Sequence, residues 1–477
     1  MRKFDTSVQE LKYKVLKEVA SLAFEDRLDS DLINIPDKIV PGPNATMRCC
    51  IYKERAIVKE RIVMAMGGDR NNENVIEVLP IACDECPITQ ISVTDACRGC
   101  IAHYCVNNCP RDAVKIIDHK ATIDHDKCIL CGKCVKACPY SAIRKSLRPC
   151  ENACKIKALS MDENKKAKID NNKCIQCGAC VYQCPFGAIM DKSYILDVIR
   201  ILKESRGSRD YNVYAVVAPS ISGQFSVPMG KVVSGIRALG FHSVIEAAWG
   251  ADIVAYKEAK ELAKKGFLMS SCCPAFVKYI EMQFPKLKES ISQNLSPMAE
   301  ISKYIKKSDP DCKIIFIGPC TAKKAEIQKD RVHKYVDSVL TFEELQALFD
   351  SRELELQEMP EQPLDNASYF GRIFARSGGL GDAVAQALKE HGIPESEFKL
   401  NCISCSGIED CKTALLKAGS GVLKENFIEG MACVDGCIGG PACLTHGPKD
   451  RQAVDKYGME AVSYTHLDVY KRQLIYR

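Results

Sequence analysis

The sequence lacks any long apolar run. None of its hydrophobic stretches approaches the roughly 20 residues that a membrane-spanning helix requires. Residues 1–5 also lack the apolar segment of a secretory signal. We therefore expect a cytoplasmic protein.

The chain has little net charge. Its 66 Lys and Arg against 61 Asp and Glu give +5 over 477 residues, and no basic block stands out. This argues against a nucleic acid partner but leaves room for a surface site that receives an acidic redox protein. The length predicts two or three domains rather than a single core.

Cysteine, by contrast, is abundant, with 28 copies. A dense disulfide framework is typical of short secreted chains, whereas most of these cysteines follow CxxCxxCxxxCP spacing. Ligation of iron-sulfur clusters explains both the number and the spacing.

Two runs match the spacing of bacterial ferredoxins. They are Cys128, Cys131, Cys134 and Cys138 before Pro139, and Cys174, Cys177, Cys180 and Cys184 before Pro185. In a two-cluster ferredoxin, the first three cysteines of a run bind one 4Fe-4S cubane and the fourth reaches across to the other. Each run therefore needs a partner run.

A third run, with two extra residues after its second cysteine, can pair with the run at 128–138. It comprises Cys97, Cys100, Cys105 and Cys109 before Pro110. The pairing predicts two cubanes. Their ligand sets are Cys97, Cys100, Cys105 and Cys138, and Cys109, Cys128, Cys131 and Cys134.

The run at 174–184 has no intact partner. Two pairs have the spacing of the two halves of a run, namely Cys83 with Cys86, and Cys150 with Cys154. As a split run they predict two more cubanes, with the ligand sets Cys154, Cys174, Cys177 and Cys180, and Cys83, Cys86, Cys150 and Cys184. The intact runs end in an apolar pair such as Ala142-Ile143, and the 150s segment shares this ending. The alternative is three cubanes and a spare set of cysteines.

The flanking regions carry different patterns. Residues 1–80 hold no cluster motif, and their role stays open. Ser7 with Glu10 predicts a capping box that opens an amphipathic helix. Cys49 and Cys50 fit packed thiols as well as ligands, so we assign them no role. The iron-sulfur domain is expected over 81–195.

From about residue 195, strands and helices alternate. Apolar runs predict strands over 211–218, 243–246 and 313–318, and amphipathic patterns predict helices over 227–239, 251–265 and 342–349. This order predicts an α/β catalytic domain over 210–461, with its site on loops that follow strands, preceded by α+β ferredoxin-like 4Fe-4S domains. Residues 462–477 resemble translated adapter sequence, and we interpret them as a non-native tail.

Three cysteine segments lie within the predicted catalytic domain. They are Met-Ser-Ser-Cys-Cys-Pro-Ala-Phe at 269–276, Gly-Pro-Cys-Thr-Ala-Lys-Lys at 318–324, and the glycine-rich Met-Ala-Cys-Val-Asp-Gly-Cys at 431–437. Glycine lets a backbone approach a metal cluster closely. In this order the segments resemble those of the iron-iron (FeFe) hydrogenases, and the resemblance covers roughly residues 210–460.

The resemblance implies an H-cluster, a 4Fe-4S cubane joined through one cysteine to a diiron unit that carries CO, cyanide and a bridging dithiolate. Its cubane ligands would be Cys273, Cys320, Cys433 and Cys437. Cys437 would be shared with the diiron unit. Four thiolates are what a cubane needs.

The resemblance also implies a proton route. Cys272 would relay protons, because a thiol can both donate and accept. The route outward would run through Glu261, Ser292 and Glu258, of which the two acids share a helical face. Judged without the resemblance, Cys272 fits a buried small residue equally well, and acids on a Lys-rich helix are more often solvated.

Further residues match those around the diiron unit. Lys323 would contact one cyanide, and Ser220 with Pro219 would hold the other. Met431 would line the pocket. Gly318 stands where the family usually has methionine and Phe276 where it usually has tryptophan. These departures, with a changed segment after Cys437, indicate a divergent subgroup.

A last group of thiols has no counterpart in these motifs. It consists of Cys402, Cys405, Cys411 and Cys443. The group could form a further metal site or a redox-sensitive cluster of thiols, and packed thiols explain it equally well.

The resemblance thus implies a hydrogenase of anaerobic metabolism that interconverts protons and electrons with molecular hydrogen. Electrons would pass along three to four N-terminal cubanes from a ferredoxin or flavodoxin, and maturation proteins would supply the diiron unit. Two alternatives stay open: a sensor that keeps an H-cluster, and a pure electron-transfer protein with only cubanes. No appended signalling domain is visible, which counts against the sensor.

Overall fold

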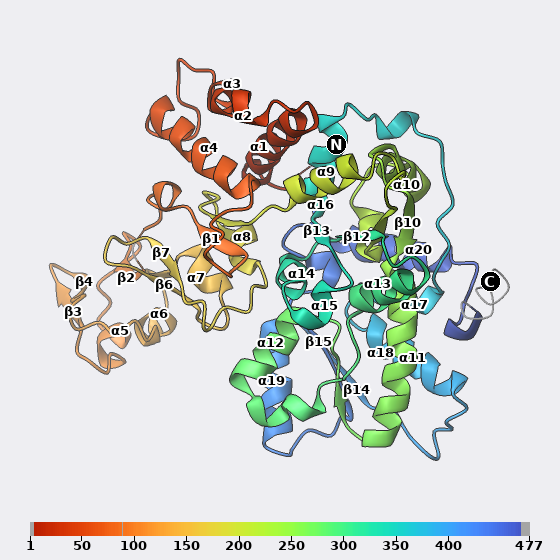
Figure 1. Ribbon diagram of the computed structural model, residues 1–477. Helices are drawn as coiled ribbons and strands as arrows, with labels where there is room; N and C mark the ends of the chain where they lie inside the picture. The colour runs from red at the N-terminus through yellow and green to blue at the C-terminus, as the bar shows by residue number, and fades with distance from the viewer. Residues whose placement is uncertain (1–3, 88, 469–477) are drawn as a thin grey trace.

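The computed structural model describes residues 4–87 and 89–468. The predicted iron-sulfur region forms an arm that projects from a larger α/β domain, which we call the catalytic domain after its predicted role (Figure 1). Over these residues, no helix has both the length and the apolar character needed to cross a membrane.

The catalytic domain is built on a four-stranded parallel sheet. Its strands, in spatial order, are β10 (Ser243–Glu246), β9 (Val213–Val217), β12 (Lys313–Ile317) and β13 (Ser338–Leu340). Helices pack around it, including α10 (Met229–Ala238), α11 (Ala247–Lys265), α13 (Pro297–Ser308) and α16 (Phe342–Ser351). The strands and helices predicted for this region are confirmed to within a few residues. Apolar strands buried on both faces are typical of parallel sheets covered by helices.

A second parallel sheet completes the domain. It has the order β11 (Leu268–Met269), β15 (Phe427–Met431) and β14 (Cys402–Ser406). All three cysteine segments follow strands, namely β11, β12 and β15. The loops that bear the thiols therefore meet at the carboxyl ends of the strands, where ligands bind in open α/β sheets.

The arm consists of one ferredoxin-like unit inserted into another. In the outer unit, β1 (Ile76–Val78) pairs with β8 (Ile189–Asp191), and β6 (Leu159–Met161) pairs with β7 (Ala167–Ile169). The inserted unit lies between β1 and β6 in the sequence and has the same pairing of strands. There β2 (Gln90–Val93) pairs with β5 (Ile143–Ser146), and β3 (Val114–Ile117) with β4 (Lys120–Ile123). The insertion separates the two halves of the outer unit's first cysteine run.

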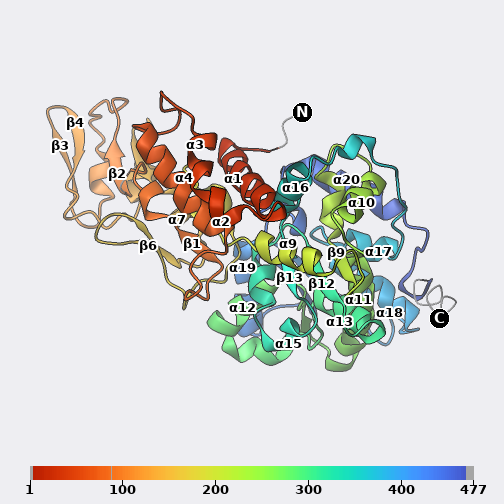
Figure 2. The same cartoon turned by 45° about the horizontal axis from the view of Figure 1, so that its top comes forward.

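The N-terminal helices pack against both parts of the molecule. Helix α1 (Ser7–Phe24) contacts α4 (Ile51–Ala65), α9 (Ile195–Glu204) and α16, and Figure 2 shows it beside α16. Its apolar residues share one core with the catalytic sheet. The predicted capping box is wrong in detail, because Thr6 is the N-cap and accepts a hydrogen bond from the backbone N–H of Gln9 at 3.2 Å.

The segment interpreted as adapter sequence is described as far as Asp468. Ser463 forms an isolated bridge with Ser368, and Tyr464 stacks on Tyr369. Residues 469–477 of this segment lie outside the described residues. The interpretation as a non-native tail stays a prediction.

Candidate active site

The inserted unit has two small cavities, each lined by four cysteines. One is lined by Cys97, Cys100, Cys105 and Cys138. The other is lined by Cys109, Cys128, Cys131 and Cys134. In each, three thiols come from one run and the fourth from the other, which is the exchange expected of a two-cluster ferredoxin.

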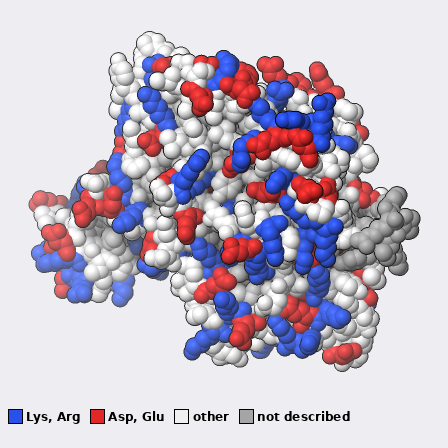
Figure 3. Space-filling view, in the orientation of Figure 1, with Lys and Arg blue, Asp and Glu red and all other residues white. Residues whose placement is uncertain are grey.

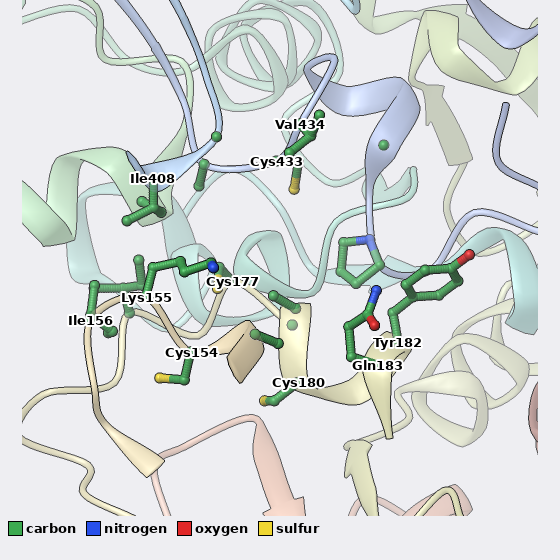
Figure 4. Close-up of a pocket in the computed structure, with 18 of the residues that line it drawn as sticks. Cys154, Lys155, Ile156, Cys177, Cys180, Tyr182, Gln183, Ile408, Cys433 and Val434 are labelled. Carbon is green, nitrogen blue, oxygen red and sulfur yellow. The ribbon is translucent and has the colours of Figure 1, made fainter. Parts of the chain in front are cut away.

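The outer unit repeats this arrangement. Cys83, Cys86, Cys150 and Cys184 line a third small cavity. Cys154, Cys174, Cys177 and Cys180 lie on one side of a larger cavity of about 900 Å³. Figure 4 shows Cys154, Cys177 and Cys180 there, with Cys433 of the catalytic domain on the opposite side. The split run therefore brings its first three cysteines to one cavity and its fourth to the other, as an intact run does.

One backbone contact recurs at all four cavities. The fourth cysteine of each run accepts a hydrogen bond at 3.2–3.4 Å from the N–H of the alanine four residues later. These alanines are Ala113, Ala142, Ala158 and Ala188, the first members of the apolar pairs that end the runs. Backbone donors aimed at sulfur stabilise thiolate ligands and tune cluster potentials. In the described part of the chain, no three Cys, His, Asp or Glu side chains converge closely enough to hold a single ion.

The three cysteine segments of the catalytic domain enclose one pocket. Cys273, Cys320, Cys433 and Cys437 all line it, together with Cys272. Burial raises the pKa of Cys437 to about 12 and that of Cys320 to about 11. Buried thiols of this kind need a compensating cation to become thiolates, and a metal cluster supplies one. The donor set fits a cubane.

The rest of the pocket wall is mostly apolar. Alanine, proline, methionine and phenylalanine side chains form it, among them Pro219 and Met431. Lys323 is the cation in this wall, and its Nζ lies 2.5 Å from Oε2 of Glu326 and 3.4 Å from the carbonyl oxygen of Cys272. Ser220, one residue beyond Pro219, is buried, and its Oγ has no hydrogen-bond partner among the described residues. An unpaired buried hydroxyl at this position suits an additional ligand.

A row of polar side chains leads away from Cys272. Glu258 on α11 is fully buried, and its Oε1 accepts hydrogen bonds from the N–H and Oγ of Ser271, both at 3.3 Å. Ser292 donates to Oε2 of Glu261 at 3.2 Å, and Glu261 pairs with Lys265 at the surface. Glu258 is thus the inner acid and Glu261 the outer one, the reverse of the order predicted.

The chain matches known proteins over both parts. Residues 211–441 match the family model described as "Iron only hydrogenase large subunit, C-terminal domain", and residues 121–144 and 167–190 match a 4Fe-4S binding domain. The chain is an FeFe-hydrogenase-like protein. Its catalytic domain carries the family's loops, and its arm carries ferredoxin-like units.

Individual relatives are distant. The FeFe-hydrogenase-like chain is 29% identical to Iron hydrogenase 1 of Clostridium pasteurianum over 72% of its own length and 69% of that protein. It is 32% identical to the cytosolic Fe-S cluster assembly factor NAR1 of Kluyveromyces lactis, but over only 20% of each chain. A solved [FeFe]-hydrogenase structure aligns with a TM-score of 0.50 at 20% identity, over 59% of this chain and 93% of that one, which shows a shared fold.

Two departures from the family pattern have local compensation. A Cβ at Gly318 would lie 2.6 Å from the ring of Phe316, which lines the pocket, so this phenylalanine fills the space beside the glycine. A Cβ at Gly430 would lie 2.2–2.3 Å from the ring of Phe276. Glycine at 430 therefore lets Phe276 pack directly on β15 behind the cysteines of the pocket.

The four additional thiols occupy different surroundings in the FeFe-hydrogenase-like protein. Cys405 and Cys411 are buried side by side behind the pocket, and Sγ of Cys411 donates to the carbonyl oxygen of Met431 at 3.5 Å. Cys402 lies against Glu429 and the start of α18 (Gly379–Glu390). Cys443 donates to the carbonyl of Ile438 at 3.4 Å. This dispersal favours packed thiols over a shared metal site.

Sequence reasoning missed several members of the polar row. Ser271 contacts Glu258 directly, and Nδ2 of Asn294 donates to both Ser292 and Glu261 at 3.0 Å. Lys265 could have been found, because it lies four residues after Glu261 on the same helix. Asn294 carries no such signal, since its position depends on the irregular segment that precedes α13.

Proposed function

We propose that the protein is a hydrogenase that reversibly reduces protons to molecular hydrogen in an anaerobic cytoplasm. The proposal rests on the pocket in which four cysteines converge beside Cys272 and Lys323. Cys273, Cys320, Cys433 and Cys437 would hold the cubane of an H-cluster, with Cys437 shared with its diiron unit. The bound cluster would supply the hydrogen chemistry.

The chain's own residues would move the proton. Cys272 carries a thiol at the pocket wall, and burial raises its pKa well above the usual value, which keeps it protonated and able to donate. Glu258 lies behind it, and burial raises the pKa of Glu258 to about 7. A carboxyl group with this pKa gains and loses a proton readily near neutral pH. Ser292 and Glu261 would continue the route to the surface.

Other residues would exclude water and hold the diiron unit in place. The apolar wall, including Met431, keeps the pocket dry, which strengthens every polar contact inside it. Lys323 would face one anionic ligand, and the unpaired Oγ of Ser220 is available to donate to another.

Electrons would enter along the arm through four cubanes. The two sets in the inserted unit would be farthest from the pocket, and the set at Cys154 would be next to the cubane ligand Cys433 (Figure 4). A ferredoxin or flavodoxin is the proposed partner. Residues 95–146 of the inserted unit include nine Lys and Arg and five Asp. Figure 3 shows charges of both signs on the surface of the arm. This excess of positive charge would favour an acidic protein.

Hydrogen assays on cysteine variants test the proposal. We expect Cys272→Ala to keep its iron and lose at least about 100-fold in turnover, because general acid–base groups contribute that much or more. Cys437→Ala should lose the diiron unit and all activity. Cys312→Ala, which removes a buried thiol in the core of the catalytic sheet, is the matched control. Near-normal turnover by Cys272→Ala would remove the relay role.

A further inference from the structure

Five ionisable side chains meet in one fully buried network. They come from α1 (Lys12), β8 (Asp191), α14 (Lys324) and α16 (Glu343, Glu344), where α14 spans Thr321–Glu326. Nζ of Lys12 lies 2.6 Å from Asp191 and 2.5 Å from Glu343. Nζ of Lys324 lies 2.9 Å from Asp191 and 2.8 Å from Glu344. The network therefore joins the N-terminal region, the outer ferredoxin-like unit and the catalytic domain.

Such a network is a poor source of net stability. Each of its side chains is at most 7% exposed, so all five charges have lost their hydration. The desolvation cost of buried ion pairs commonly cancels their attraction, whereas the loss of one partner leaves an uncompensated charge. Instead, the network fixes the relative positions of the helices and the strand that contribute its side chains.

One element that the network holds is α14, which begins directly after the cubane ligand Cys320. Its neighbouring lysines point in different directions. Lys323 lines the pocket, while Lys324 lies in the buried network and also donates to the carbonyl oxygen of Lys192 at 2.7 Å. The network thus holds α14 from behind and sets the direction in which Lys323 points.

Helix α1 and the residues just before it contact a second loop through hydrogen bonds. Nε2 of Gln9 donates to Glu343 at 3.1 Å and to the carbonyl oxygen of Cys443 at 2.9 Å. Asp5 accepts from Nδ1 of His446 at 2.8 Å, and its N–H donates to the carbonyl of Leu444 at 3.3 Å. These contacts fix the segment that follows the cubane ligand Cys437.

We propose that α1 is a brace for the active-site pocket, and that Lys12 and Gln9 are positioning residues that hold two of the three cysteine loops. This gives the N-terminal region a role although it carries no cluster motif. The inference rests on the proposed function only where it concerns Lys323 and the diiron unit. The positioning of the loops that carry Cys320 and Cys437 requires only that these cysteines bind a cubane.

Infrared spectra of the full-length, matured protein test the brace. In Lys12→Met and in Gln9→Leu, we expect wild-type iron content, displaced or broadened CO and cyanide stretches, and turnover reduced about 10-fold or more, as for other residues that orient metal ligands. Gln9→Leu removes no charge, so it remains informative if Lys12→Met fails to fold. Lys14→Met is the control, because Lys14 lies on the same helix and its ion pair with Glu10 is exposed.

Two outcomes would overturn the brace. The first is unchanged stretches in folded Lys12→Met and Gln9→Leu with only a lower melting temperature, which would reduce α1 to a structural role. The second concerns the case in which the wild type itself shows no such stretches and the proposed function fails. The brace is then judged on the paramagnetic resonance of the reduced cubane: an altered spectrum in Gln9→Leu supports it, and an unchanged spectrum refutes it.

Discussion

Glu258 is a fully buried acid beside the pocket, and its burial has a measurable cost in stability. Burial raises its pKa from 4.5 to about 7. A carboxyl group whose folded pKa is raised stabilises the fold fully below its unfolded pKa, and this stabilisation is lost as the pH rises through the folded pKa. The loss is on the order of 3 kcal/mol at high pH.

We therefore predict that Glu258→Gln becomes progressively more stable than the wild type between about pH 4.5 and 7, because the amide stays neutral. Thermal melting across this range measures the difference. Glu261→Gln is the control, since Glu261 lies near the surface and is paired with Lys265. A difference for Glu258→Gln that does not change with pH would contradict the assignment of Glu258 as the buried acid.

The close contact between Gly430 and the ring of Phe276 leads to a second prediction about single residues. A methyl group there would overlap the ring of Phe276, so Gly430→Ala should destabilise the protein by about 1–3 kcal/mol and release iron from the pocket. Melting temperature and iron content report the effect. Combining it with Phe276→Leu should recover part of the loss, and a double variant no better than Gly430→Ala would show that the contact is unimportant.

At the scale of elements, the nested ferredoxin-like units make the pairing of cysteine runs testable. If Cys86 and Cys150 bind one cubane, either Ser variant should lose about four iron atoms, and the double variant should lose no more. Iron quantitation on purified protein gives the count. Cys86→Ser with Cys131→Ser should lose about eight, because these thiols line different cavities. A loss of eight from Cys86→Ser with Cys150→Ser would contradict the split run.

The sequence allowed much of this to be predicted, for physical reasons. Cysteine spacing is set by cluster geometry within a few residues of chain, so spacing alone predicts the four sets of cysteines that line the four cavities. Strands such as β9 and β12 are continuous apolar runs and were equally recognisable. The N-cap Thr6 was missed because Ser7 offers the same chemistry one residue later.

Long-range polar contacts could not be predicted. Lys12 and Glu343 are 331 residues apart, and although Lys12 falls on the buried face of α1, periodicity does not identify its partner. The order of Glu258 and Glu261 also depended on how α11 packs against the loops after β11. Periodicity places both acids on one helical face, but it does not say which end of that face is covered.

At the scale of the whole molecule, three parts act together. The nested units would carry electrons, the pocket would hold the cluster, and α1 would lock the two together. This arrangement differs from a catalytic domain with loosely attached redox modules, because α1, the outer unit and the catalytic domain share the buried network around Asp191.

The central claim is that the pocket holds a diiron unit as well as a cubane. Its most direct test is the infrared spectrum of protein produced anaerobically with the hydrogenase maturation proteins. We predict stretches from metal-bound CO and cyanide, which are lost in Cys437→Ala and retained in Cys312→Ala. Their absence from wild-type protein with a full set of cubanes would show that the pocket holds no diiron unit, and would identify a multi-cluster electron carrier instead.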